Sequence, residues 1–207
     1  MDLSARIISL VFHPLLMATY LFTLLSFTLP SALDPIQVNG HRGFIALIFL
    51  VSFLLPALNI GIFKLLGSIK SLTMYERNER IVPFSFISIL YLVITYLFYT
   101  KFRVGLNDNV LKLMLIGDAL VLISTVVTYF YKVSIHSVGL CGLLGIILPL
   151  NKVTEDNQLF IPTIVLIVVA GMVMSSRLQL KAHKPREVLV GSLLGFTIGF
   201  FGMAILF

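Results

Sequence analysis

The sequence predicts an all-α membrane protein: a polytopic membrane helix bundle of about six to seven transmembrane helices, forming a single integral membrane domain over residues 1–207. Three observations lead to this prediction. Hydrophobic residues make up 58% of the chain and charged residues only 12%, far less charge than the surface of a soluble domain needs. The mean hydropathy is +1.05. Apolar runs long enough to cross a bilayer recur along the whole chain.

The first apolar run, at about 7–29, is too long for the core of a secretory signal peptide and fits a retained transmembrane helix. The fifth run is short unless residues 132–136 form its first turn. The last span is expected to begin at Pro185, because proline suits the first turn of a helix. The seven candidate spans are about 7–29, 43–66, 83–100, 110–131, 137–150, 159–175 and 187–207.

The net charge of +6 is explained by membrane topology and anionic lipid head groups, because the basic residues lie in short loops between the spans. We therefore expect a multi-pass protein of the cell (inner) membrane, in contact with the lipid bilayer and without a nucleic-acid partner. The single cysteine, Cys141, lies in an apolar run and excludes an internal disulfide. The sequence leaves the oligomeric state open.

The densest cationic segment, residues 175–191, lies between the last two apolar runs and is expected at the membrane surface. It contains Arg177, whose guanidinium could bind phosphate oxygens as a fork of donors. It also contains His183, a possible nucleophile or proton carrier, and Glu187, a carboxylate that could orient the histidine ring. We expect His183 just before the last helix, exposed and without a packing role, and Glu187 in the first helical turn.

This segment resembles the third signature of the type 2 phosphatidic acid phosphatase superfamily, which reads Ser-Arg, five residues, His, three residues, Asp. Ser176, Arg177 and His183 match it, and Glu187 stands in the position of the Asp. The superfamily includes bacterial undecaprenyl-pyrophosphate phosphatases.

Two further segments resemble the other signatures of that superfamily. Val133-Ser134-Ile135-His136 keeps the Ser and His of a Pro-Ser-Gly-His signature. Lys70 and Arg77 have the spacing of a signature that reads Lys, six residues, Arg-Pro, with Asn78 in the position of the proline. Arg80 is a rival for the role of Arg77. With seven spans, all three segments fall on the membrane face of the N-terminus.

The resemblance implies a membrane-embedded phosphatase that hydrolyses a lipid phosphate or a prenyl pyrophosphate through a phosphohistidine intermediate. It makes His183 the nucleophile, His136 the acid that protonates the leaving oxygen, and Glu187 the residue that orients His183. It implies no metal and no cofactor. The phosphate-binding residues would be Lys70, Arg77, Ser134 and Arg177.

Two alternatives remain open from the sequence. The first is a catalytically decayed, lipid-phosphate-binding or scaffold membrane protein, because Val133, Ile135 and Asn78 replace residues of the signatures. In that case His136 would simply bond a carbonyl at a span boundary. The second is a small transporter, because Asp118 and His13 are ionisable residues inside predicted spans. Both residues also have a purely structural interpretation. His13 could form a structural hydrogen bond beside Pro14, and Asp118 could pair with a polar residue such as Arg103.

Overall fold

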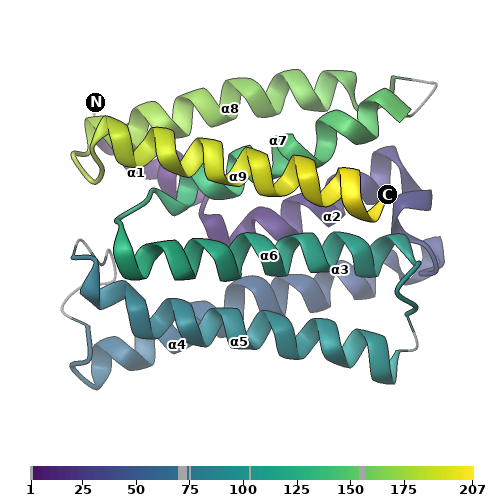
Figure 1. The fold of residues 1–207 in the computed structure, drawn as a ribbon, viewed down its shortest axis with the longest axis horizontal. Coiled ribbons are helices and arrows are strands. Elements are labelled where there is room, and N and C mark those ends of the chain that lie inside the picture. The colour runs from purple at the N-terminus through teal and green to yellow at the C-terminus, as the bar shows by residue number, and fades with distance from the viewer. Residues whose placement is uncertain (1, 70–73, 75, 103, 154–156) are drawn as a thin grey trace. The chain divides into compact units, whose positions relative to one another are not determined.

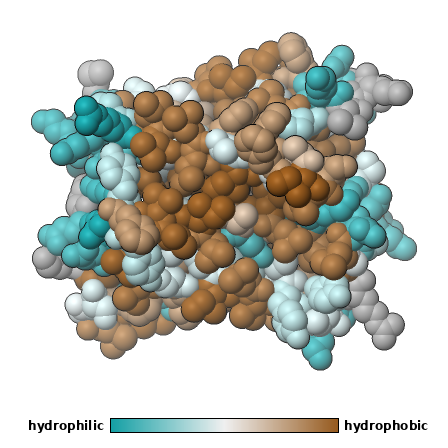
Figure 2. Space-filling model, viewed as in Figure 1, coloured by the Kyte–Doolittle hydropathy of each residue, from teal (hydrophilic) through white to brown (hydrophobic). Residues whose placement is uncertain are grey.

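The computed structural model describes residues 2–69, 74, 76–102, 104–153 and 157–207. Within these residues all regular structure is helical (Figure 1), which confirms the predicted all-α class. Seven helical segments are long and apolar enough to cross a membrane. Apolar side chains form a broad field across the helices, and hydrophilic side chains gather at the margins (Figure 2). The protein is therefore a multi-pass membrane protein.

The chain divides into two compact units, and unit 1 contains residues 1–17 and 133–207. Its first helix ends before the His13-Pro14 pair, and a short 3₁₀ turn follows. The first predicted span is thus interrupted, because a proline lacks the N–H that a continuous helix requires. The elements of unit 1 are α1 (Asp2–Val11), the 3₁₀ turn (Pro14–Leu16), α7 (Ile135–Val153), α8 (Phe160–Gln179) and α9 (Pro185–Leu206).

Helices α7 and α9 of unit 1 pack in parallel at very short range. A Cβ atom added to Gly191 would lie 2.7 Å from the carbonyl oxygen of Ser134, and one added to Gly195 would collide with the carbonyl of Val138. Small residues let helix backbones approach in this way in membranes. The two contacts repeat at the same sequence offset, so the N-termini of α7 and α9 lie at the same end of unit 1.

Unit 2 contains residues 18–132. Its second predicted span is a helix broken in the middle by a turn of π-helix, Leu50–Leu54. Helices α5 and α6 pack against each other, and the π turn contacts α5. The elements of unit 2 are α2 (Met17–Thr28), which begins at the boundary with unit 1, 3₁₀ turns at Pro30–Leu33 and Val38–Gly40, α3 (His41–Phe49), α4 (Leu55–Leu65), α5 (Asn78–Lys101) and α6 (Asn109–Phe130).

The largest differences from the predicted span ends are at the starts of the first three spans, which begin at Asp2, Val38 and Asn78. Helix α7 begins at Ile135 and extends to Val153, so residues 135–136 do belong to its first turn and the fifth span has full length. Helix α9 begins at Pro185 as predicted, with Lys184 as its N-cap residue.

Candidate functional site

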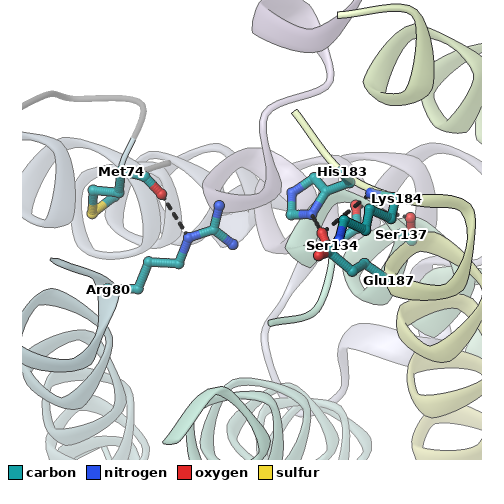
Figure 3. A network of polar contacts seen from close by, with 7 residues as sticks. All are labelled: Met74, Arg80, Ser134, Ser137, His183, Lys184 and Glu187. Carbon is teal, nitrogen blue, oxygen red and sulfur yellow. Dashed lines mark hydrogen bonds and ion pairs between the residues drawn. The ribbon is translucent and has the colours of Figure 1, made fainter. Parts of the chain in front are cut away.

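The candidate site of unit 1 is organised around the pair formed by His183 and Glu187. His183 Nδ1 lies 2.8 Å from Glu187 Oε2 (Figure 3), and the same oxygen accepts a hydrogen bond from the backbone N–H of Lys184 at 3.3 Å. Because Pro185 starts α9, Glu187 is in the first turn, where a carboxylate is favoured by the helix dipole. An ionised carboxylate only accepts hydrogen bonds, so Nδ1 carries a proton, and in the neutral form of the ring the lone pair is on Nε2.

The expectation of an exposed His183 without a packing role is wrong. Its side chain is only 2% exposed, and that of Glu187 only 10%. The neighbouring Ala182 and Val188 are buried too, whereas Lys184 and Arg186 between them are exposed, so one side of the α8–α9 connection is packed into the protein. Burial makes the interaction between the carboxylate and the ring strong, since little water screens it.

The segment before α7 is attached directly to the start of α9. The backbone N–H of Ser134 donates to the carbonyl oxygen of Glu187 at 3.1 Å, and the Ser137 hydroxyl donates to the Ser134 hydroxyl at 3.0 Å. Both serines are fully buried. The close approach at Gly191 makes this attachment possible, because any side chain there would meet the Ser134 backbone. Ser134 is therefore held beside the His183–Glu187 pair (Figure 3).

The electrostatic field at this end of unit 1 favours an anion. Two parallel helices, α7 and α9, direct their N-termini here, and the first N–H groups of a helix have no acceptor within it. Arg177, in the last turn of α8, adds a half-buried guanidinium. It acts electrostatically on both His13 and His136. A phosphate group is the kind of ligand that such helix ends and an arginine bind together.

His136 is in the first turn of α7. It makes the hydrogen bond to a backbone carbonyl that the non-catalytic interpretation of this residue predicted. Its Nε2 lies 3.1 Å from the carbonyl oxygen of Ser9 in α1, so Nε2 is the protonated nitrogen. The rings of His13 and His136 contact each other edge to face, with centroids 5.7 Å apart. His183 is also near enough to His136 to act on it electrostatically.

His13 has the structural bond beside Pro14 that the sequence predicted. Its Nδ1 accepts a hydrogen bond from the backbone N–H of Leu15 at 3.3 Å, so it caps the 3₁₀ turn. The structure nevertheless brings His13 into the same cluster as His136 and Arg177. No sequence motif connects residue 13 with residues 136 and 177. The only sequence feature that drew attention to His13 was its position before a helix-breaking proline.

The residues of the first signature belong to unit 2 or lie outside the described residues. Lys70 is among the latter. The guanidinium of Arg77 donates to the carbonyl oxygens of Tyr129 and Phe130, both at 2.9 Å, and so caps the C-terminus of α6. The buried Arg80 donates from Nε to the carbonyl oxygen of Met74 at 2.8 Å (Figure 3). The assignment of either arginine to phosphate stays a prediction.

The fold and the site together define a helical multi-pass membrane protein with a buried histidine–carboxylate pair at the end of one helical unit. In the part of the chain that the structure describes, no three His, Cys, Asp or Glu side chains are grouped as metal ligands. No family model matches this chain, and neither the curated proteins nor the solved structures give a match.

Proposed function

We propose that unit 1 is a membrane-embedded phosphatase that hydrolyses a lipid phosphate or a prenyl pyrophosphate through a phosphohistidine. The observation that supports the proposal is the bond of 2.8 Å between His183 and Glu187, which leaves Nε2 as the nitrogen that could act as a nucleophile. The site is at one end of a set of membrane-spanning helices, which suits a substrate with a phosphate head and an apolar tail. The resemblance of the segment 176–187 to the third phosphatase signature leads to the same reaction.

In the first half-reaction, the lone pair of His183 Nε2 attacks phosphorus. An N–P bond forms while the bond from phosphorus to the leaving oxygen breaks, and that oxygen takes up one proton. The ring becomes positively charged as the bond forms, and the carboxylate of Glu187 stabilises this charge. In the second half-reaction, water attacks phosphorus and gives one proton to His136, the N–P bond breaks, and inorganic phosphate leaves while His183 returns to its neutral form.

His136 is the proposed acid for the leaving oxygen, and its hydrogen bond restricts how it can act. Nε2 already donates to the Ser9 carbonyl, so the transferred proton has to come from Nδ1 of a doubly protonated ring, a form that the nearby Arg177 guanidinium disfavours until an anionic phosphate is bound. Arg177 and the N-terminus of α7 bind the phosphate oxygens. Positioning and charge stabilisation of this kind carry most of phosphoryl transfer.

Phosphate release by the detergent-purified protein tests the proposal. The substrates are a short-chain phosphatidate, a phosphatidylglycerol phosphate and farnesyl pyrophosphate. We expect hydrolysis of at least one of them by the wild type, an acid-labile phosphoryl group on the denatured protein, and neither of these with His183→Ala. Arg186→Ala is the matched control, because this cation of the same segment is exposed. Hydrolysis by His183→Ala at the wild-type rate would contradict the mechanism.

The second candidate is a decayed site that binds a lipid phosphate without hydrolysing it. The observation in its favour is the bond of His136 to the Ser9 carbonyl, which accounts for this histidine without catalysis. Under this alternative, lipid phosphates raise the melting temperature of the protein, Arg177→Ala removes the effect, and no phosphate is released from any substrate.

A further inference from the structure

Unit 2 contains a second polar cluster, inside its membrane-spanning helices and separate from the residues of the proposed phosphatase. Its carboxylate is Asp118, nine residues after the start of α6, which corresponds to about 14 Å along the helix axis. The residue is therefore close to the middle of the span, and it is 5% exposed. An ionisable side chain at this depth is unfavourable and usually marks a functional site.

The bonding of Asp118 is incomplete. Helix α5 packs against α6, and its Thr95, which is 6% exposed, interacts with Asp118. The second carboxylate oxygen, Oδ2, is buried and has no hydrogen-bond partner within the described residues. Arg103, the partner that the sequence suggested, lies outside the described residues. A buried carboxylate oxygen without a donor needs a proton or a cation.

Further hydroxyl groups continue the cluster from α5 to the π turn. Tyr91 is one helical turn before Thr95 on α5, a helix that contacts the π turn, and it interacts with both Asp118 and Ser52. Ser52 is 3% exposed and lies within the π turn Leu50–Leu54. Its hydroxyl oxygen is 3.4 Å from that of Thr19. Turns of π-helix inside longer helices are frequent at functional sites.

The chemistry of these groups selects the class of ligand. The atoms that could bind an ion are the oxygens of one carboxylate and several hydroxyls. Hard oxygen ligands of this kind suit alkali and alkaline-earth cations rather than transition metals. Among the described residues the cluster contains one carboxylate, Asp118, so a monovalent cation would leave the buried site neutral and a divalent one would not.

We propose that Asp118, Thr95, Tyr91 and Ser52 form a binding site for one monovalent cation of the size of Na⁺ in the membrane interior of unit 2. The site does not depend on the phosphatase proposal, because it shares no residue with it. It is a specific place at which a small transporter of this architecture would bind a coupling ion.

The test compares the melting temperature of the detergent-purified full chain in 100 mM NaCl and in 100 mM choline chloride. With a dissociation constant of about 10 mM, Na⁺ would shift the unfolding equilibrium about elevenfold and raise the melting temperature by about 3 to 6 °C. Asp118→Asn should remove this shift, and Asp34→Asn, which alters an exposed loop carboxylate, should preserve it. His183→Ala should also preserve it, even if it abolishes phosphatase activity.

Thr95→Val and Ser52→Ala provide a second measurement in case Asp118→Asn does not fold. Each removes one hydroxyl with a small change of volume, and each should raise the NaCl concentration at which half of the shift is reached. Equal melting temperatures of the wild type in NaCl and choline chloride would overturn the proposal. So would a shift that Asp118→Asn retains, or a stability that depends on Asp118 and on pH but not on Na⁺, since the group would then bind only a proton.

Discussion

Replacing Glu187 by glutamine isolates the contribution of its charge. In the wild type, Oε2 accepts hydrogen bonds from His183 Nδ1 at 2.8 Å and from the Lys184 N–H at 3.3 Å. Glutamine has the same length, and its amide oxygen can take the place of Oε2 in both bonds. We therefore expect Glu187→Gln to keep the start of α9 and the Nδ1–H form of His183, and to lose only the negative charge.

The size of the effect follows from the difference between a charged and a neutral hydrogen bond. The former contributes about 1.5–3 kcal/mol and the latter about 0.5–1.5 kcal/mol, so the loss is about 1–1.5 kcal/mol. Screening by water and salt reduces this energy only slightly, because the side chains of His183 and Glu187 are only 2% and 10% exposed. If this charge stabilises the ring while Nε2 attacks phosphorus, kcat should fall about 5- to 12-fold.

The assay measures kcat for phosphate release, and ¹⁵N NMR of labelled histidine reports which ring nitrogen of His183 carries the proton. Glu187→Ala is the companion variant. It removes the acceptor of the buried His183 Nδ1–H and of the partly buried Lys184 N–H, so it should lower the melting temperature as well as kcat. A Glu187→Gln protein with wild-type kcat would refute the role of the charge. If the Glu187→Gln protein is instead as inactive as His183→Ala while His183 keeps its proton on Nδ1, the predicted 5- to 12-fold loss is refuted.

Three further variants separate chemistry, binding and folding. His183→Ala should abolish formation of the phosphoenzyme, and because the side chain is buried it should also lower the melting temperature of the protein in a thermal scan. Arg177→Lys should raise KM for a lipid phosphate about tenfold with a smaller effect on kcat, since an ammonium cannot act as a two-donor fork; an unchanged KM would remove Arg177 from the site. Arg77→Ala should lower the melting temperature by about 2–4 °C, because it removes the cap of about 1 kcal/mol on the carbonyls of Tyr129 and Phe130. A raised KM at unchanged melting temperature would instead favour the phosphate-binding role of Arg77.

The fold class and the number of spans were predictable because they depend on composition and on the length of apolar runs. The internal breaks were not predicted. A hydropathy pattern averages over a whole span, so it does not detect the 3₁₀ turn after His13, although Pro14 was a visible signal. The π turn at Leu50–Leu54 is followed by Pro56 in the first turn of α4, so a proline was a visible signal for this break as well.

The local part of the site was predictable, and the contacts between distant segments were not. The start of α9 at Pro185 and the spacing of four residues place Glu187 beside His183 whatever the rest of the chain does. By contrast, the bond of His136 to Ser9 joins residues 127 positions apart. It depends on how α1 packs against α7, which no local pattern specifies. The burial of His183 was missed for the same reason.

The close packing of α7 and α9 makes a last prediction about Gly191→Ala. The added methyl group would lie 2.7 Å from the Ser134 carbonyl oxygen and 3.3 Å from Ser137 Cβ, so α7 has to move away from α9. Overpacking of this kind costs about 1–3 kcal/mol, which lowers the melting temperature by about 2 to 12 °C. Because Ser134 is bonded to the Glu187 backbone, the shift should also alter the site and reduce ligand affinity. Gly171→Ala in α8 is the matched control, since its methyl group would meet nothing within 4 Å. Equal melting temperatures of the two variants would show that α7 and α9 are not held at this distance, and would remove the basis for placing their two N-termini around one anion.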